Sequence, residues 1–372
     1  MYKTIGIVTG GGDAPGLNAV IRAAVKTATG QFGMRVIGIE DSFEGCLGET
    51  RARELTPNEV RGLLPRGGTI LGTRNRGCFV VRERDGRVTK PEETYREAIS
   101  NLERLGIEAL VVLGGEGTLA IAAEFDRLGF AVVGVPKTID NDLAATELTF
   151  GFLTALDIAT EALDRLHTTA ESHDRVMILE VMGRHAGWIA LHSGIAGGAD
   201  VILIPEIPFS VEAVAQKIRE REASGSQFSI LVVAEGAQEL GRDAIYQEQG
   251  DRVRSPRLGG IGNYLREEVE RLTGKETRTV VLGHLQRGGT PNAFDRMMAT
   301  TFGACAVRAL ACGERGVMVA LRSGEVRTVP LLEAVSALKT VPPDGQLVRT
   351  ARDTGISFGA PDEATNGGTK QK

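Results

Sequence analysis

Short apolar runs of strand length alternate with longer amphipathic stretches along most of the chain, and this alternation is what most constrains its fold. The predicted strands cover residues 5–9, 35–39, 109–113, 131–135, 176–181, 201–204, 229–234 and 279–282. Between them lie predicted helices at residues 15–28, 92–105, 118–128, 149–169, 186–196, 211–223, 259–272 and 294–311. Strands that are apolar on both faces and alternate with helices are typical of parallel sheets covered by helices.

The number of strands and the length of 372 residues favour two sheets over one. We therefore predict an α/β fold of two doubly wound, Rossmann-like domains with mainly parallel sheets. In such sheets, ligands bind at the loops that follow the carboxyl ends of the strands.

Glycine is unusually frequent, at 48 of 372 residues or about 13%, against a usual share of about 7%. Many glycines follow predicted strands, in the loops 10–16, 114–118, 183–187 and 283–289, while the loop 136–142 carries acidic residues instead. Glycine in these places lets backbone amides approach a phosphate closely. The five strand ends together predict one active-site cleft, which we place between the two domains.

The overall charge and composition exclude several classes of function. A net charge of −5 and an aromatic content of 5% disfavour a nucleic-acid-binding module. No apolar run approaches the ~20 residues of a membrane span, and the first residues lack the pattern of a signal peptide. The four cysteines show no metal-binding spacing, so we expect reduced thiols and a cytoplasmic protein without membrane contact.

Residues 10–16 read Gly-Gly-Gly-Asp-Ala-Pro-Gly and lead into a predicted helix. Exposed amides at a helix N-terminus suit a phosphate. The Gly-Lys-Ser/Thr of a Walker A loop is missing, and the last glycine of the Rossmann pattern is displaced to Gly16, after Pro15. A tight strand–helix turn explains this segment as well as a phosphate-binding loop does.

In the loop 114–118, three glycines flank Glu116 at another predicted helix start. Glu116 is suited to hold Mg²⁺ directly or through water. Thr118 is suited to cap the helix or to bind a phosphate oxygen. Helix capping alone is the alternative interpretation of this loop.

Residues 138–142 read Thr-Ile-Asp-Asn-Asp, so two carboxylates stand at positions i and i+2. On an extended stretch, Asp140 and Asp142 point to the same side. One is suited to act as a base on a substrate hydroxyl and the other to organise metal or water, beside the cation of Lys137. The alternative is an Asx-rich turn.

Four arginines stand at the ends of predicted strands. Arg184 and Arg287 follow strands, whereas Arg175 and Arg278 begin them, so the latter two lie at the opposite end or reach in from a neighbouring subunit. A cluster of arginines suits a phosphorylated anion or transition-state charge. Each arginine alone is explained equally by a solvated surface position, and His284 by a structural role.

Taken together, these segments resemble the 6-phosphofructokinases. The matching segments are 11–18, 136–142, 182–184 and 283–289, followed by Pro291, Phe294, Asp295 and Arg296, and they span residues 3 to about 322 in the family's order. The resemblance implies phosphoryl transfer from ATP to the 1-hydroxyl of fructose 6-phosphate, giving fructose 1,6-bisphosphate and ADP in glycolysis. It also implies Mg²⁺ and a homo-oligomer, a tetramer or a dimer, with active sites completed across subunits.

The resemblance further implies roles for individual residues. Asp140 would be the catalytic base, Thr138 and Asp142 would support substrate and metal, and Arg184 would stabilise transition-state charge. The sugar-phosphate side would also include Arg175, Met182, Gly183, Glu235, Arg278, His284 and Arg287, with Arg175 and Arg278 from a neighbouring subunit. The donor side would include Gly11, Arg74 or Arg76, Gly115, Glu116, Gly117, Thr118 and Lys137. Glu116 would be the metal ligand, although the family commonly has Asp there.

The implied domain division follows the same resemblance. Residues 1–139 with about 256–310 would bind the phosphoryl donor, and residues 140–255 would bind the sugar phosphate. Residues 311–358 would pack on the domains. Residues 359–372 are rich in Gly, Thr, Asn and Lys, and are expected to form a disordered tail.

Two positions carry opposite indications about the phosphoryl donor. Gly117 resembles the ATP users, because pyrophosphate users tend to carry Asp, whose bulk and charge oppose the α-phosphate of a nucleotide. Lys137 resembles the pyrophosphate users. We favour ATP because a glycine leaves space for the nucleotide, while a flexible lysine can move aside. Pyrophosphate is the alternative donor.

Two other classes compete with this interpretation. A non-catalytic sugar-phosphate sensor would be expected to lack Asp140 or Glu116, and both are present. A kinase acting on NAD or a lipid would leave residues 138–142 and 284–287 unexplained. The basic residues Arg22, Lys26, Arg51 and Arg53 are explained either by an effector site, as in bacterial relatives, or by solvated surface charge.

Overall fold

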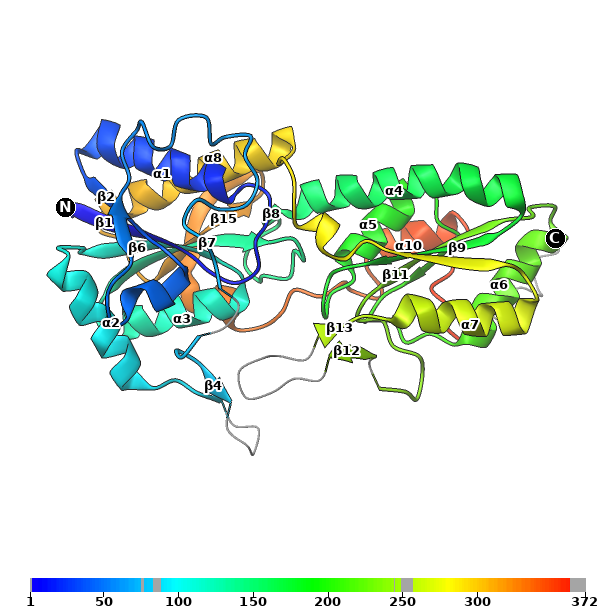
Figure 1. The fold of residues 1–372 in the computed structure, drawn as a ribbon. Coiled ribbons are helices and arrows are strands. Elements are labelled where there is room, and N and C mark those ends of the chain that lie inside the picture. Colours follow the sequence, from blue (N-terminus) through cyan, green and yellow to red (C-terminus); the bar gives the residue numbers. More distant parts are fainter. Residues whose placement is uncertain (1, 75–76, 83–87, 244, 249–256, 362–372) are drawn as a thin grey trace. The chain divides into compact units, whose positions relative to one another are not determined.

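The computed structural model describes residues 2–74, 77–82, 88–243, 245–248 and 257–361 (Figure 1). These residues form two compact units. Of the described residues, unit 1 contains 2–154 and 287–338, and unit 2 contains 155–248, 257–286 and 339–361. Within these ranges, no helix combines the length and apolarity that a membrane crossing requires.

Unit 1 is built on an eight-stranded sheet in the order β16-β15-β7-β6-β1-β2-β3, with β8 pairing to β7. Its strands are β1 (Thr4–Thr9), β2 (Arg35–Ile39), β3 (Ala52–Glu54), β6 (Ala109–Gly114), β7 (Ala131–Thr138), β8 (Phe150–Gly151), β15 (Val317–Arg322) and β16 (Glu325–Pro330). All neighbouring pairs are parallel except β2 with β3 and β15 with β16. The register aligns Thr9 with Leu113 and Leu113 with Val135, so three loops leave the sheet at one edge.

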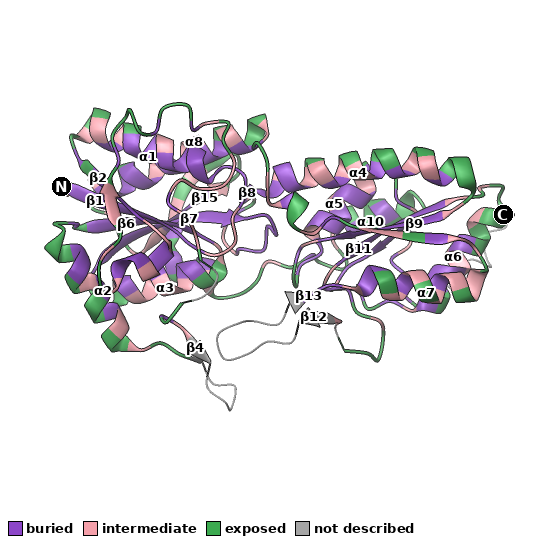
Figure 2. Cartoon of the chain, viewed as in Figure 1, coloured by how far each residue is buried: buried purple, intermediate pink, exposed green. Residues whose placement is uncertain are grey.

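Helices cover both faces of this sheet (Figures 1 and 2). One face carries α1 (Leu17–Phe32) and α8 (Ala293–Ala311), and the other carries α2 (Glu92–Arg104), α3 (Glu116–Arg127) and α9 (Leu331–Val335). Side chains alternate along a strand, so Ile7 packs in the core beneath α1 and α8, while Val8 packs in the core beneath α2 and α3. The short elements of this unit are a 3₁₀ helix η1 (Ser42–Cys46), β4 (Val81–Arg82) and β5 (Val88–Thr89).

Unit 2 has a four-stranded, fully parallel sheet in the order β10-β11-β9-β14. Its strands are β9 (Val176–Val181), β10 (Val201–Leu203), β11 (Ser229–Ala234) and β14 (Thr277–Val281), and a small ladder joins β12 (Tyr246–Glu248) to β13 (Arg257–Leu258). The helices are α5 (Trp188–Ala196), α6 (Val211–Ala223), α7 (Ile261–Thr273), α10 (Gln346–Asp353) and the 3₁₀ helix η2 (Gly283–Gln286). Helix α4 (Phe152–His173) begins in unit 1 and continues in unit 2.

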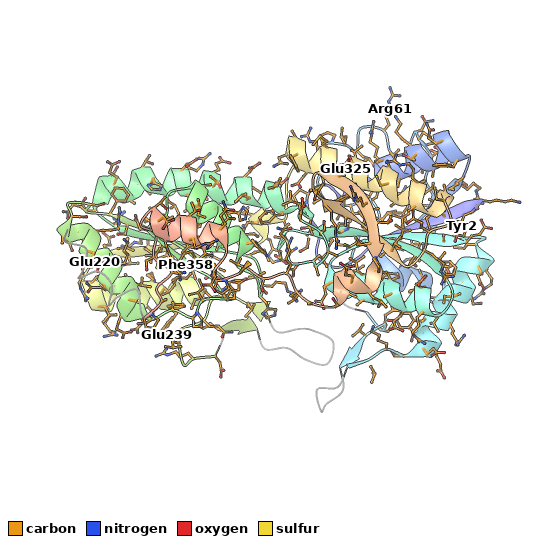
Figure 3. The ribbon with its side chains drawn as sticks, turned by 180° about the vertical axis from the view of Figure 1, so that it is seen from behind. Tyr2, Arg61, Glu220, Glu239, Glu325 and Phe358 are labelled. Atoms are coloured by element: carbon orange, nitrogen blue, oxygen red, sulfur yellow. The ribbon has the colours of Figure 1, made fainter. Side chains whose placement is uncertain are left out.

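The predicted fold class is confirmed, and every predicted strand and helix is present, with its ends at the predicted residues or within a few of them. The hairpin of β15 and β16 was not predicted. Glu325, which is labelled in Figure 3, begins β16, and this strand is largely polar, with exposed and half-buried positions in alternation. The polar edge strand β16 gives no apolar run, whereas β15 (Val317–Arg322) does contain one at residues 317–321, which the sequence reasoning overlooked.

The compact units differ from the predicted domain boundaries. Residues 257–286 belong to unit 2 rather than to the donor domain, because β14 pairs with β9 along its whole length. Residues 140–154 belong to unit 1, because β8 pairs with β7. The segment 311–358 is divided, since β15 and β16 complete the sheet of unit 1 and residues from 339 onwards belong to unit 2.

The predicted disordered tail, 359–372, includes residues that are packed in the structure. The carbonyl of Gly359 accepts a hydrogen bond from the amide of Ser210 at 2.8 Å, and Ala360 is buried. Phe358, labelled in Figure 3, is buried with the guanidinium of Arg352 lying 5.3 Å from its ring centroid. Residues 359 and 360 are therefore packed, Pro361 is exposed, and the rest of the predicted tail, 362–372, lies outside the described residues.

Candidate active site

The loop after β1 is a tight turn shaped by glycine. Gly11 and Gly16 have φ angles of 76° and 110°, in the left-handed region that favours glycine. The amide of Gly10 donates to the carbonyl of Leu113 at 2.9 Å, and that of Gly11 donates to the carbonyl of Arg74 at 3.2 Å. The first two amides of the loop are therefore bonded within the protein, and Gly16 is the N-cap of α1.

The side chain of Thr118 packs against the ends of both β1 and β6, at Gly10 and Gly114. Its side chain is buried, and a Cβ atom at either Gly10 or Gly114 would collide with it. The N-cap of α3 is Gly115, which makes no side-chain cap. The interpretation of Thr118 as a helix cap is therefore wrong, and the glycines at the two strand ends make room for its side chain.

Glu116 and Gly117 form the exposed first turn of α3. A Cβ atom on Gly117 would meet no protein atom within 4 Å, so the space above this position is open. The described residues contain no group of three or more His, Cys, Asp or Glu side chains arranged to hold a metal ion. A single exposed carboxylate nevertheless fits Mg²⁺, which takes most of its ligands from water and substrate phosphates at such sites.

The loop after β7 is a turn, not an extended stretch. Strand β7 continues to Thr138, and Asn141 then adopts φ of 52°. Asn141 Oδ1 accepts a hydrogen bond from the amide of Thr149 at 3.1 Å, and Thr149 Oγ1 donates to the carbonyl of Thr138 at 2.7 Å. The argument that Asp140 and Asp142 share a side because the backbone is extended is therefore wrong, and Thr149 is a supporting residue that the sequence reasoning missed.

Asp140 has one carboxylate oxygen held in place and one without a hydrogen-bond partner. Its side chain is buried, and Oδ2 accepts from Thr138 Oγ1 at 3.3 Å. The same Thr138 oxygen accepts from the amide of Asp140 at 3.1 Å, which fixes the turn. Oδ1 has no hydrogen-bond partner among the described residues. Buried polar atoms are rarely left unpaired, so this acceptor is suited to a substrate hydroxyl.

Lys137 is a buried cation beneath the loop after β1. Its Nζ donates to the carbonyl of Gly12. Burial and the nearby guanidinium of Arg287 lower the pKa of Lys137 to about 8, and the carboxylates of Asp140, Asp13 and Asp142 partly oppose this shift. The expectation that Lys137 is a flexible side chain able to move aside is therefore wrong.

Arg287 brings a second cation to the same loop. Its Nη1 donates to the carbonyl of Asp13 at 3.2 Å, and a Cβ atom at Gly12 would lie 2.8 Å from the same nitrogen. Residues 12–13, 137 and 287 therefore meet within unit 1, although they are far apart in sequence. Two cations against a glycine loop make this a favourable place for an anion.

The loop after β9 presents Arg184 on a constrained turn. Arg184 is exposed, has φ of 53°, and donates its amide to Glu235 Oε1 at 3.1 Å. A Cβ atom at Gly236 would collide with the carbonyl of Arg184, and Gly183 has φ of 141°. Glu235 and Gly236 therefore shape the backbone that carries the Arg184 guanidinium.

The loop 182–187 is also tied to the segment that follows β14. The amide of Met182 donates to Oε1 of the fully buried Gln286 at 2.8 Å. Gln286 Nε2 has no hydrogen-bond partner among the described residues. The sequence reasoning did not single out Gln286, although it lies between His284, which is exposed, and Arg287.

Arg175 and Arg278 lie at the opposite end of the sheet of unit 2. They stand where β9 and β14 begin, about 15–20 Å of strand away from the loops that follow these strands. Arg175 Nε lies 2.9 Å from Glu276 Oε2, and Arg278 Nη2 donates to the other oxygen of this carboxylate. The adjacent guanidinium groups of Arg175 and Arg278 hold the pKa of Glu276 below its usual range. Neither arginine reaches the loop 182–187 of its own unit.

Arg74 was predicted on the donor side, and in the structure its guanidinium pairs with a carboxylate. Its Nη2 lies 3.1 Å from Asp41 Oδ2, which also pairs with Arg51 Nε at 3.3 Å. Arg51 is one of the basic residues considered for an effector site, and its ion pair with Asp41 explains its presence without an effector. Arg76, the alternative to Arg74, lies outside the described residues.

Comparisons with known proteins point to one family. A family model described as Phosphofructokinase matches residues 4–310. The ATP-dependent 6-phosphofructokinase of Chloroflexus aurantiacus is 58% identical over 357 residues, which cover 96% of this chain and 98% of the relative. The pyrophosphate–fructose 6-phosphate 1-phosphotransferase of Streptomyces coelicolor is 50% identical, over 95% of this chain and 99% of the relative.

Solved structures show the same fold. The phosphofructokinase of Pichia pastoris in the T-state superposes with a TM-score of 0.76 at 34% identity, covering 90% of this chain and 38% of that chain. The pyrophosphate-dependent phosphofructokinase of Marinobacter aquaeolei superposes with a TM-score of 0.77 at 23% identity, covering 100% of this chain and 98% of the other.

Proposed function

Because the chain belongs to the phosphofructokinase family, we propose that it transfers the terminal phosphoryl group of ATP to the 1-hydroxyl of fructose 6-phosphate. The products are fructose 1,6-bisphosphate and ADP, and the reaction is a step of glycolysis. The observation that carries this proposal is the carboxylate of Asp140, which is buried, fixed by Thr138 and left with one unpaired oxygen.

Asp140 accepts the proton of the sugar hydroxyl as that oxygen attacks the phosphorus. A sugar hydroxyl is a poor nucleophile near neutral pH, so a placed carboxylate assists the attack. Thr138 keeps Oδ2 occupied, which directs Oδ1 at the hydroxyl. Alignment and charge neutralisation supply most of the rate enhancement in phosphoryl transfer. Arg184, held by Glu235, contributes positive charge where the phosphoryl group is transferred.

Glu116 is the carboxylate that would hold Mg²⁺. When bound, the ion would help to neutralise the negative charge of the donor phosphates. The exposure of Glu116 and the open space beside Gly117 leave room for donor phosphates. Asp142, in the separate loop 138–142, supports substrate and metal.

ATP is the donor that Gly117 favours. An aspartate there would meet no protein atom at its Cβ, so only a bound ligand would be affected by it. Two observations favour pyrophosphate as the second candidate donor. Lys137 is a fixed buried cation rather than a movable one, and the Streptomyces coelicolor relative is named for pyrophosphate. The identity to the Chloroflexus aurantiacus relative, which is named for ATP, is higher.

The sugar phosphate is bound by His284 and Arg287 together with Arg175 and Arg278 of a neighbouring subunit. Arg175 and Arg278 stand at the end of their sheet opposite to the loops that follow β9 and β14. We therefore infer that a homo-oligomer, either a tetramer or a dimer, completes the site. Met182 and Gly183 contact the sugar, and Glu235 binds its hydroxyls. Gly11, Arg74, Gly115 and Thr118 line the donor side, and the enzyme acts in the cytoplasm.

The donor is tested by assaying the purified protein with fructose 6-phosphate and Mg²⁺, supplying either ATP or pyrophosphate. We expect turnover with ATP and at most weak turnover with pyrophosphate. Turnover with pyrophosphate alone establishes the second candidate. No formation of fructose 1,6-bisphosphate with either donor refutes the proposed function.

A further inference from the structure

Asp295 is a fully buried carboxylate that has no place in the chemistry proposed above. It stands in the first turn of α8, and its Oδ1 accepts a hydrogen bond from the amide of Gly151 at 3.0 Å. Its Oδ2 accepts from the amide of Thr154 at 2.8 Å and from the hydroxyl of Thr154 at 2.6 Å. Burying a charge is costly unless it is well hydrogen-bonded, and these three bonds meet that need.

The bonds of Asp295 join the N-termini of two helices. Thr154 lies in the first turn of α4, and its Oγ1 also accepts from the amide of Asn292 at 3.0 Å. Asn292 is the N-cap of α8, where its Oδ1 accepts from the amide of Asp295 at 2.8 Å. Helix N-termini stabilise negative charge, so the starts of both α4 and α8 favour a carboxylate here. The start of α4, up to Thr154, and the strand before it are thereby tied to the start of α8 within unit 1.

Strand β8, which precedes α4, supports the turn 138–142 that carries Asp140. In β8, Gly151 and Phe150 pair with Thr138 and Lys137 of β7. One residue earlier, Thr149 donates its hydroxyl to the carbonyl of Thr138 and its amide to the side chain of Asn141. Gly151 is thus bonded directly to Asp295, while its strand neighbours hold both sides of the turn that carries Asp140.

We propose that Asp295 is a positioning residue for Asp140, acting through β8 and Thr149. This inference rests on the proposed function for its catalytic readout. Loss of one carboxylate oxygen at position 295 leaves the amide of Gly151 or the groups of Thr154 without an acceptor. The segment 149–151 then loses its fixed position, and the turn 138–142 moves with it. Substrate-binding groups outside this turn keep their places.

The matched variants are Asp295→Asn and Asp200→Asn. Asp200 is a partly buried carboxylate of unit 2 that accepts a hydrogen bond from the amide of Ile230 at 2.8 Å and pairs with Arg221 at 2.7 Å. We expect D295N to lower kcat by about 10- to 100-fold, since a misplacement on the order of 1 Å can cost as much as 10²-fold. The KM values for ATP and fructose 6-phosphate should stay within about 3-fold, while D200N lowers Tm but leaves kcat within about 2-fold.

Thr149→Val provides a second variant if D295N fails to fold. It keeps the volume of the buried threonine and removes the hydroxyl that bonds to Thr138. We expect the same pattern as for D295N, a lower kcat at nearly unchanged KM. A kcat within about 2-fold of the wild type in either D295N or T149V overturns the proposal, and so does a fall in D200N as large as that in D295N.

Hydrogen exchange without substrates separates this inference from the proposed function. Amides of residues 138–142 should exchange faster in D295N and T149V than in the wild type, and should be unchanged in D200N. Unaltered exchange in this segment overturns the positioning role whatever the activity. If the wild type phosphorylates no fructose 6-phosphate but the exchange pattern is as expected, the proposed function fails and the structural link between Asp295 and the loop stands.

Discussion

The sharpest test of the proposed mechanism is the substitution Asp140→Asn. The asparagine has nearly the same shape, and its amide oxygen can accept the hydrogen bond that Thr138 Oγ1 now gives to Oδ2 at 3.3 Å. The NH₂ group then takes the place of Oδ1, the oxygen that has no hydrogen-bond partner among the described residues. A hydrogen-bond donor in that place can still contact the sugar hydroxyl, but it cannot take its proton.

The expected loss follows from this exchange of an acceptor for a donor. A positioned general base contributes about 10²–10⁴ in rate, which is about 3–5 kcal/mol of activation free energy. We therefore expect kcat to fall by about 10²–10⁴, with the KM for fructose 6-phosphate changed by less than about 3-fold. Steady-state ADP release at saturating ATP measures the first, and titration with the sugar phosphate measures the second.

The control is Asp126→Asn, at a partly exposed carboxylate near the end of α3 that pairs with Arg315 at 2.8 Å. This variant makes the same chemical change far from the loop 138–142 and should keep kcat close to the wild type. A D140N enzyme that retains more than about a third of the wild-type kcat refutes the assignment of Asp140 as the base, because a lost general base costs about 10²–10⁴ in rate.

Three further predictions address the donor, the buried lysine and the subunit interface. Gly117→Asp should raise the KM for ATP by at least about 10-fold without lowering Tm, since the carboxylate would oppose the nucleotide in open space; unchanged ATP kinetics contradict the steric argument. The pKa of Lys137 lies at about 8, so the KM for the donor should rise as pH increases above 8, and Lys137→Met should abolish that rise. Between about pH 8 and 10.5, Lys137 is protonated in the unfolded chain but deprotonated in the folded protein. The free energy of unfolding should therefore increase with pH in this window, and K137M should lack this increase. The same pH dependence of denaturation in the wild type and K137M contradicts the lowered pKa of Lys137. Mixed oligomers of Arg175→Ala and Asp140→Asn chains should regain activity that neither variant has alone. Only a site shared between subunits can combine an intact Asp140 from one chain with an intact Arg175 from another. Activity no higher than the sum of the separate variants argues for sites within one chain.

The elements of the two sheets could be predicted because their signal is local. β2, β9, β11 and α6 begin and end at the predicted residues, and buried parallel strands need apolar side chains on both faces. The β15–β16 hairpin was missed for two reasons. The apolar run of β15, which pairs with β7, has the same pattern as the predicted strands and was overlooked, whereas β16 gives a weak signal because half of its residues face solvent. The boundary errors at 140–154 and 256–286 have a different cause, because strand pairing rather than chain order decides which unit a segment joins.

The candidate site shows the same division between residue identity and residue environment. The sequence identified Asp140, Lys137 and Arg287, since acids and cations after strand ends are visible in the residue types. It did not predict that Lys137 is buried against Gly12, that Asn141 has a positive φ, or that Glu276 joins Arg175 to Arg278. Each of these depends on contacts between segments that are distant in sequence or on a local backbone angle that several residue types allow.

The sequence by itself determined the alternating α/β architecture, the glycine-rich strand ends and the kinds of charged group available at them, because apolar periodicity and residue type act over a few neighbouring positions. Only the tertiary structure decided which of those groups are held and which are left open. The bond from Thr138 to Asp140 Oδ2 is local, but the burial of Asp140 and the support from Asp295 through β8 arise from long-range packing. Hydrogen bonds between residues more than a hundred positions apart depend on how the whole sheet is assembled, and no local pattern in the chain records that assembly.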